Sequence, residues 1–299
     1  MGFMEIPAQL EALFTKGVTE LMLIGSDNCF IDRGGALERV RSPFDSDAEL
    51  SSLLIELALE SGSRLDLAKP MADFSISNFR LSAQLRSAVS TLPMVTIRRH
   101  PKSQITLEHL LTTLMLTQSQ ANFLSEAVRT EKTVLISGAT SSGKTTLLGA
   151  LVHQSAQRCA VIEQTPEIKV SAPSFSFLER PNNQEGVGLI SQSELLTAAL
   201  RMRPDRLVLG EVRGAEFVAL LQAVNNGHPA LATLHARSLA EVPSRLLLLG
   251  QLANIDRELV AQLAMGIDYV VQLENRETRR VSEIGKLKLD PFEVVPIEL

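Results

Sequence analysis

One segment of the chain has the residue types and the spacing of a phosphate-binding loop. Residues 138–145 read GATSSGKT and fit the pattern G-x-x-x-x-G-K-[ST]. Its glycines let the backbone curl so that successive N–H groups point at phosphate oxygens, and the N-terminus of a following helix favours an anion. Lys144 would reach the β- and γ-phosphates of a nucleotide, and the hydroxyl of Thr145 would bind Mg²⁺. The predicted nucleotide contacts in this loop are Gly138, Ala139, Thr140, Ser141, Ser142, Gly143, Lys144, Thr145 and Thr146.

Two carboxylates follow short apolar runs that read as buried strands. Glu211 ends RLVLGE, and Glu163 ends AVIE. In an open α/β sheet the ligand crevice lies at the carboxyl ends of the strands, where both side chains would emerge. We predict that Glu211 orients water or binds the metal, with Glu163 as its partner. The competing interpretation is an ordinary solvated acid, and it is stronger for Glu163 because a proline-bearing turn follows.

Histidines and arginines supply further candidates. His228 and His235 bracket the strand pattern ALATLH, which favours a functional pair over two structural residues. The segment LRMRPDR places three arginines just before the Glu211 strand, and forked guanidinium donors suit phosphate recognition. Of Arg201, Arg203 and Arg206, we take Arg203 as the nucleotide-contact candidate and expect at least one of the three to be only a surface charge.

The elements that must position these residues alternate from about residue 106 onward. Short apolar runs, each followed by a helical pattern, are typical of a parallel sheet with helices on both faces. The predicted strands are residues 133–137, 160–163, 206–211 and 230–235, and helices over 107–115 and 118–130 precede them.

The first hundred residues show shorter strands and helices. A polar, proline-bearing segment at residues 99–106 separates them from the rest and predicts a linker. We therefore expect an α/β chain with an N-terminal α/β domain (1–100), a linker (101–106) and a P-loop domain (107–299). In the first domain the predicted strands are 19–24, 29–32, 79–85 and 93–99, with a hairpin turn at 33–35 and helices at 7–16 and 45–62.

Composition excludes several classes of function. The 299 residues are 45% hydrophobic with 4% aromatics and a net charge of −5, which disfavours a base-stacking or electrostatic nucleic-acid surface. Cys29 and Cys159 are far apart and form no C-x-x-C motif, so neither a zinc site nor a disulfide framework is expected. No apolar run approaches 18 residues, and no export leader is visible. We expect no transmembrane segment and a reducing, cytoplasmic setting.

Taken together, four segments resemble the secretion-ATPase superfamily that powers type II and type IV secretion and type IV pilus machines. GATSSGKTT resembles its Walker A box, VIEQTPEI its Asp box, LRMRPDRLVLGEVRG its Walker B region and GHPALATLHARS its His box. Residues 18–40, 180–206 and 266–284 look most like the tight-adherence (Flp-type) pilus assembly branch. The likeness covers the chain from about residue 18 to residue 284.

This resemblance implies a cytoplasmic ATPase at the inner face of the cytoplasmic membrane. Its subunits would have a RecA-like C-terminal domain, form a homo-hexameric ring and bind ATP and Mg²⁺ between the two domains. His228 and His235 would sense the γ-phosphate, and by motif position Arg80 and Arg98 would reach the phosphates from the N-terminal domain. The ring would couple hydrolysis to assembly or secretion of pilin-like subunits through an inner-membrane platform protein.

Three departures from the family pattern leave alternatives open. The Asp box usually reads Glu-Asp but here is Glu163-Gln164, the His box is one residue shorter, and the usual Asp-Gly-Arg is Asn78-Phe79-Arg80. A nucleotide-binding scaffold with little hydrolysis is one alternative. A type IV secretion or conjugation motor is another, although the acidic charge argues against direct contact with DNA.

Overall fold

The chain divides into two compact units, Met1–Ser103 and Gln104–Leu299. The structure is a computed structural model, and it describes residues 5–33, 36–99, 105–180, 188–275 and 278–299. Most of the predicted linker, residues 101–104, and both glycines of the predicted hairpin turn lie outside these residues. Thr106 already caps a helix, so the second unit begins within the expected linker. The limits of 1–100 and 107–299 stay a prediction.

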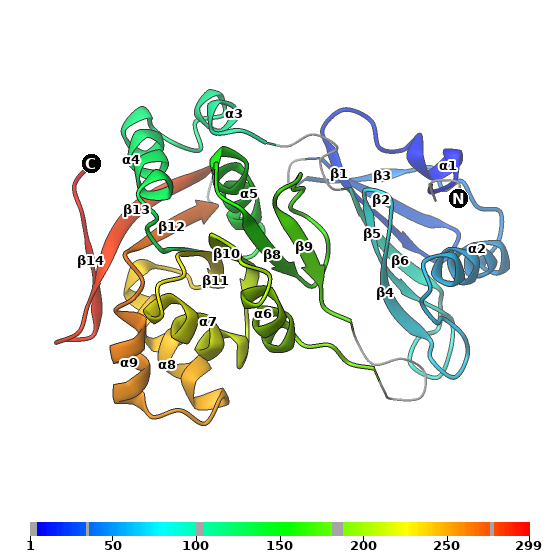
Figure 1. Cartoon of the computed structure of the whole chain (residues 1–299). Coiled ribbons are helices and arrows are strands. Elements are labelled where there is room, and N and C mark those ends of the chain that lie inside the picture. Colours follow the sequence, from blue (N-terminus) through cyan, green and yellow to red (C-terminus); the bar gives the residue numbers. More distant parts are fainter. Residues whose placement is uncertain (1–4, 34–35, 100–104, 181–187, 276–277) are drawn as a thin grey trace. The chain divides into compact units, whose positions relative to one another are not determined.

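The first unit is a six-stranded antiparallel sheet with two helices (Figure 1). Its strand order is β3-β2-β1-β6-β5-β4. The elements are α1 (Ala8–Glu11), β1 (Val18–Ile24), β2 (Asn28–Arg33), β3 (Ala36–Val40), α2 (Asp47–Glu60), β4 (Met71–Ile76), β5 (Phe79–Gln84) and β6 (Met94–Arg99).

Local sequence explains most of these elements. Helix α2 begins at Asp47 because the side chain of Ser46 accepts a hydrogen bond from the Glu49 N–H, an N-cap that satisfies one unpaired donor. Strands β1, β2, β5 and β6 and helix α2 match the prediction, with alternating buried positions such as Leu21 and Leu23. The helix predicted at 7–16 is only the four-residue α1. Strands β3 and β4 were not predicted, because β3 is an edge strand without an alternating buried face.

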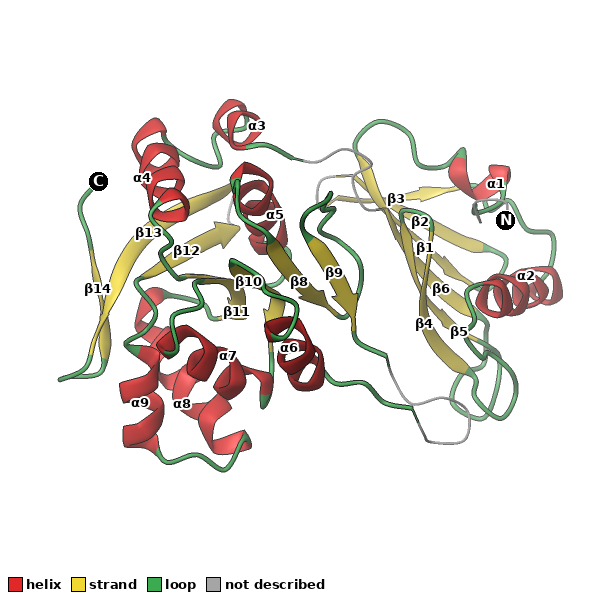
Figure 2. Cartoon of the chain, viewed as in Figure 1, coloured by secondary structure: helices red, strands yellow, loops and turns green. Residues whose placement is uncertain are grey.

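The second unit is an eight-stranded sheet in the order β14-β13-β12-β7-β11-β10-β8-β9 (Figure 2). The six strands from β12 to β9 are parallel, and β13 and β14 add an antiparallel edge. The strands are β7 (Val134–Gly138), β8 (Cys159–Glu163), β9 (Phe175–Leu178), β10 (Arg206–Val212), β11 (Ala230–His235), β12 (Tyr269–Asn275), β13 (Arg279–Lys288) and β14 (Glu293–Pro296).

Helices cover both faces of this sheet, as the sequence pattern predicts. Two separate cores result, one under α3, α4 and α5 and the other under α6 to α9. The helices are α3 (Leu107–Thr112), α4 (Gln118–Arg129), α5 (Lys144–Gln154), α6 (Gln192–Leu200), α7 (Glu216–Asn225), α8 (Val242–Leu252) and α9 (Arg257–Ala264), with a 3₁₀ turn at Leu239–Glu241. The mixed α/β fold with one mostly parallel sheet is confirmed, and all four predicted strands of this unit are present. Strands β9 and β12 to β14 were not predicted.

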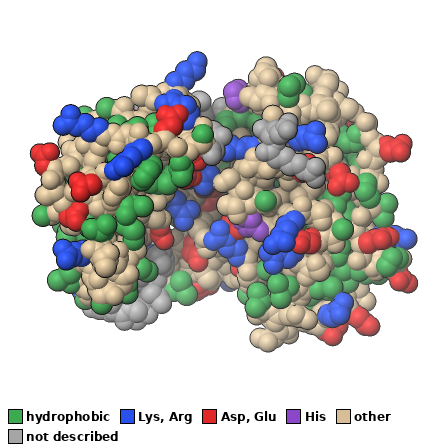
Figure 3. Space-filling view, turned by 180° about the vertical axis from the view of Figure 1, so that it is seen from behind, with side chains coloured by type: hydrophobic (Ala, Val, Ile, Leu, Met, Phe, Trp, Pro, Cys, Tyr) green, Lys and Arg blue, Asp and Glu red, His purple; other side chains and the backbone are tan. Residues whose placement is uncertain are grey.

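Charged side chains of both signs are interspersed over the face of each unit seen in Figure 3, without a broad field of one sign. Among the described residues, no helix is both long and apolar enough to cross a bilayer.

Candidate active site

The phosphate-binding loop and three candidate side chains come from neighbouring parallel strands. The loop follows β7, and β11, β10 and β8 continue the sheet on one side of it. His235 at the end of β11 stands opposite Gly138 at the end of β7. Because carboxyl ends of parallel strands share one edge of a sheet, the loop, His235, Glu211 and Glu163 all lie at that edge.

The loop geometry requires its glycines. Gly143, the N-cap of α5, has a φ of +95°, and a Cβ there would lie 2.6 Å from the Cε of Met115. A Cβ on Gly138 would lie 2.5 Å from the Ser142 hydroxyl oxygen. Gly143 has no side chain to cap the first N–H groups of α5, which have no acceptor within the helix. The buried Ser142 hydroxyl also lacks a partner among the described residues. These features fit a bound phosphate.

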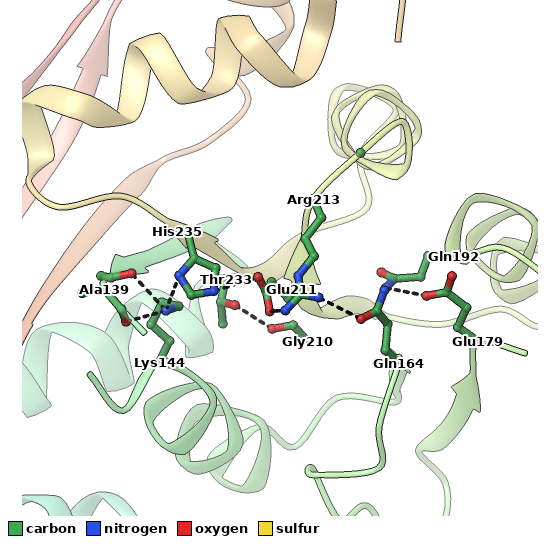
Figure 4. A network of polar contacts seen from close by, with 12 residues as sticks. Ala139, Lys144, Gln164, Glu179, Gln192, Gly210, Glu211, Arg213, Thr233 and His235 are labelled. Atoms are coloured by element: carbon green, nitrogen blue, oxygen red, sulfur yellow. Dashed lines mark hydrogen bonds and ion pairs between the residues drawn. The ribbon is translucent and has the colours of Figure 1, made fainter. Parts of the chain in front are cut away.

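Lys144 is folded back onto its own loop. Its Nζ donates to the carbonyl oxygens of Gly138 (2.9 Å) and Ala139 (2.8 Å), and it lies 3.3 Å from Nδ1 of His235 (Figure 4). Burial lowers the pKa of Lys144 to about 8, and the carboxylate of Glu211 only partly opposes that shift. A phosphate group would restore the favourable environment for its charge.

Glu211 reaches the site from an irregularity in β10. The pairing of β10 with β11 shifts register between Leu209 and Val212, and a bulge of this kind redirects side chains. Thr233 of β11 holds the bulge by donating to the Gly210 carbonyl at 2.6 Å. Oε1 of Glu211 then lies 2.8 Å from Nε2 of His235. This contact lacks hydrogen-bond geometry, and burial lowers the pKa of His235, so a neutral imidazole stands between Lys144 and Glu211.

Two arginines that the sequence reasoning did not select complete this network. Arg213 donates to Oε2 of Glu211 at 2.5 Å and to Oε1 of Gln164 at 3.1 Å (Figure 4). Arg245, on α8, donates through Nε to the backbone carbonyl of His235 at 3.1 Å. Arg213 follows Glu211 by two residues at a strand end, a signal that could have found it. Nothing in the sequence places Arg245 near the loop.

A cavity of about 500 Å³ opens beside this network. Its polar lining joins the loop to the strand ends, and its apolar lining comes from α8 and the flanking strands. The lining residues are Thr140, Glu211, Val212, Arg213, Leu234, His235, Arg245, Leu248, Leu249 and Leu252. The cavity places open space next to the groups that would meet the terminal phosphate of a nucleotide.

Comparison with known proteins agrees with this architecture. The sequence model of the family described as Type II/IV secretion system protein matches residues 5–282. The chain belongs to this secretion family. A Mycobacterium tuberculosis protein named for conjugal transfer is 32% identical over 290 residues, covering 92% of this chain and 82% of that protein. The conjugal transfer protein TrbB of Rhizobium radiobacter is 28% identical over 284 residues, which cover 91% of this chain and 84% of that protein.

Solved structures share the fold of this secretion-family chain. The ATPase DotB of Legionella pneumophila has a TM-score of 0.63 at 22% identity, covering 94% of this chain and 80% of that one. The pilus retraction motor PilT, solved with ADP, has a TM-score of 0.63 at 17% identity, and the match covers 97% of this chain and 82% of that one. The predicted superfamily is thus confirmed. The Flp-type branch has no specific support among these relatives.

Within the secretion-family site, Glu163 lies at the expected edge of the sheet, but its carboxylate contacts the turn that follows β8. It is buried, and its carboxylate accepts hydrogen bonds from the N–H groups of Glu167 and Ile168 at 3.2 Å. Burial raises the pKa of Glu163 to about 7, more than these hydrogen bonds lower it. These contacts of Glu163 stabilise the turn after β8. Its predicted partnership with Glu211 stays a proposal.

Two predicted residues lie at the opposite edge of the sheet. His228 precedes β11 and Arg203 precedes β10, so both are at the amino ends of parallel strands whose carboxyl ends meet the loop. The pairing of His228 with His235 is therefore wrong within one subunit, and so is a contact of Arg203 with the loop. Arg206 is fully buried instead, and it donates to the carbonyl oxygens of Val128 (3.0 Å) and Lys132 (2.8 Å).

The arginines expected from the N-terminal unit lie side by side on its sheet. Arg80 of β5 stands opposite Arg98 of β6, and Arg98 lies 3.6 Å from Glu20 of β1. Arg99 is structural, since it donates to the backbone carbonyls of Phe14 (2.8 Å) and Val18 (3.0 Å). That Arg80 and Arg98 reach a nucleotide stays a prediction.

The residues at this edge fit a magnesium nucleotide. Within the described part of the chain, no group of three or more His, Cys, Asp or Glu side chains could hold a metal ion. Mg²⁺ in nucleotide sites is usually held by one or two protein oxygens together with phosphates and water, so a complete protein cage is not required. Thr145, in the first turn of α5, and Glu211 are the two protein ligands to propose.

Proposed function

We propose that this chain is the ATP-hydrolysing motor of a type II/IV secretion machine, with Mg²⁺ as its metal. The observation that carries this is the continuous set of contacts from the phosphate-binding loop through Lys144 and His235 to Glu211. A loop that only binds a nucleotide needs no carboxylate at the next strand ends. A hydrolase does need a side chain that orients water beside the γ-phosphate, and a carboxylate at this edge can do so.

The side chains divide the work of hydrolysis. Lys144 leaves the loop carbonyls for the phosphates, where its positive charge stabilises the transition state. Glu211 orients the attacking water and accepts its proton. His235, which stands between them, couples the position of Lys144 to that of Glu211 and so senses the γ-phosphate. Thr145, with Glu211 as the second proposed ligand, would hold Mg²⁺, which would neutralise charge on the phosphate oxygens.

The ring and its location belong to the same proposal. We place the protein in the cytoplasm, peripheral at the inner face of the membrane, as a homo-hexamer that acts on an inner-membrane platform protein. Family membership and the division into two units support this arrangement. Sedimentation with a non-hydrolysable ATP analogue and Mg²⁺ tests the ring, because a ligand that binds the assembled form shifts the population toward it. Monomers alone at saturating analogue would exclude it.

Two machines are candidates for the motor. Segments of the sequence resemble pilus assembly ATPases of the Flp type. The relatives named for conjugal transfer, at 32% and 28% identity over more than nine tenths of this chain, favour a type IV secretion or conjugation machine. Deleting the gene and scoring both surface filaments and conjugation frequency separates the two.

The ATPase assay is the central test. Steady-state hydrolysis is measured with and without the cytoplasmic part of the platform protein, for wild type, Lys144→Ala and the control Lys288→Ala, an exposed lysine of β13. We expect Lys144→Ala to abolish hydrolysis and the control to retain it. Wild-type activity in Lys144→Ala would remove the proposal. Nucleotide binding without hydrolysis in the wild type under both conditions would instead establish the scaffold alternative.

A further inference from the structure

The second polar contact of Glu211 has no role in the proposed chemistry. Arg213 donates to Oε2 of Glu211 at 2.5 Å, while its other terminal nitrogen donates to the amide oxygen of Gln164 at 3.1 Å. The guanidinium thus joins the end of β10 to the turn after β8. The backbone of Arg213 is fixed too, because its N–H donates to Oε1 of Glu216 at 2.5 Å. Because the guanidinium is planar and both of its terminal nitrogens are engaged, its bond to Oε2 of Glu211 has a fixed direction.

Glu211 depends on this contact for its orientation. Its other oxygen, Oε1, lies 2.8 Å from Nε2 of His235 in a contact that lacks hydrogen-bond geometry. Within the described residues, Arg213 is therefore the only side chain that donates a hydrogen bond to this carboxylate. Glu211 lies on a bulge and faces the 500 Å³ cavity, so without Arg213 its side chain could take several rotamers.

The charge of the side chain at position 164 affects how strongly the Arg213 guanidinium is drawn to Glu211. Gln164 offers a neutral oxygen, which attracts Arg213 less than the charge of Glu211 does. A carboxylate in the same place would compete with Glu211 for the guanidinium.

We propose that Arg213 is a positioning residue that fixes the Glu211 carboxylate, and that the neutral Gln164 side chain directs its guanidinium to Glu211. This proposal rests on the proposed function, in which Glu211 orients water. Arg213 acts through Glu211 and does not bind the nucleotide.

The test compares four variants with wild type: Arg213→Gln, Arg213→Lys, Gln164→Glu and the control Arg257→Gln, an exposed arginine at the start of α9. Each is assayed for kcat and KM for Mg-ATP and for the Kd of a fluorescent ADP analogue. We expect Arg213→Gln to lower kcat by roughly 10- to 100-fold, the loss typical of a misplaced catalytic group. The Kd should stay within about twofold, and the control should match wild type. Arg213→Lys should recover part of kcat, because an ammonium can still donate to Oε2 of Glu211 but lacks the planar pair of nitrogens that joins Glu211 to Gln164.

Gln164→Glu places a carboxylate where the amide oxygen now lies without changing side-chain length. It should lower kcat by about two- to fivefold, the scale of an exposed ion pair, and should add nothing to Arg213→Gln. A readout independent of hydrolysis comes from melting the nucleotide-free protein. The shifts caused by Arg213→Gln and Glu211→Gln should be non-additive, because both remove one contact.

Several results would overturn the positioning role. Arg213→Gln could keep more than a third of kcat, could raise kcat, or could weaken analogue binding tenfold at unchanged kcat, which would make Arg213 a phosphate ligand. Additive melting shifts would also overturn it, even in a wild-type protein without ATPase activity. Failure of the proposed function would give a different result. The wild type would then hydrolyse ATP at a rate that Lys144→Ala leaves unchanged.

Discussion

Glu163 offers a quantitative test of the site through its pKa. The carboxyl is 3% exposed, and burial raises its pKa from 4.5 to about 7. The folded state therefore binds a proton more tightly than the unfolded state. The free energy of unfolding falls as pH rises from 4.5 to 7, and the full cost of ionising the buried group is present above pH 7. At 1.36 kcal/mol per pKa unit, that cost is about 3 kcal/mol.

The variant Glu163→Gln removes the ionisation and keeps the size of the side chain. Its amide oxygen can still accept from the N–H groups of Glu167 and Ile168, whereas the contact of Oε2 with the Ile168 N–H at 3.3 Å is lost. We take that loss, with an amide group left unpaired, as about 1 kcal/mol. The variant should therefore be about 2 kcal/mol more stable than wild type at pH 8.5 and about 1 kcal/mol less stable at pH 4.5.

Thermal unfolding at the two pH values measures this difference. For a unit of this size, 1 kcal/mol shifts Tm by about 2–4 °C, so the variant should melt about 4–8 °C above wild type at pH 8.5 and slightly below it at pH 4.5. Glu283→Gln, at an exposed position of β13, serves as the control and should show no crossover. A variant that is less stable than wild type at pH 8.5 would refute the reasoning, since it would mean that the turn amides stabilise the ionised carboxylate by more than burial destabilises it.

Three further predictions follow from the same edge of the sheet. Glu211→Gln should lower kcat by about 10²- to 10⁴-fold at saturating Mg-ATP, the usual loss for a general base, and a rate above a third of wild type would reject its assignment. Gly143→Ala should weaken binding of a fluorescent ADP analogue at least tenfold, because its φ of +95° and the nearby Met115 both oppose a Cβ. Gly149→Ala on the same helix has open space at the Cβ and should bind normally. Arg206→Met should lower the free energy of unfolding by about 2–4 kcal/mol in urea titration, because it removes the guanidinium that donates to the buried carbonyls of Val128 and Lys132, and an unchanged midpoint would contradict this.

The features of this protein that could be predicted from the sequence are those with local signals. The phosphate-binding loop is a contiguous pattern, and each of the four predicted strands is a short apolar run that needs no distant partner to be recognised. Strand direction was also available, since a residue that follows a parallel strand lies at the carboxyl edge. That rule placed Glu211 and Glu163 at the edge where they lie. Applied consistently, it would have placed His228 and Arg203 at the other edge.

Burial of charges and contacts between distant side chains came from the assembled fold. The sequence offered Arg206 as one of three candidates for phosphate contact or surface charge, but it is fully buried and donates to the carbonyls of Val128, in the last turn of α4, and Lys132, just after it. The bulge in β10 depends on pairing with β11, and the contact of Arg213 with Gln164 joins residues 49 positions apart. Side-chain burial and contacts between distant segments depend on how the sheet assembles, and no local pattern records that assembly.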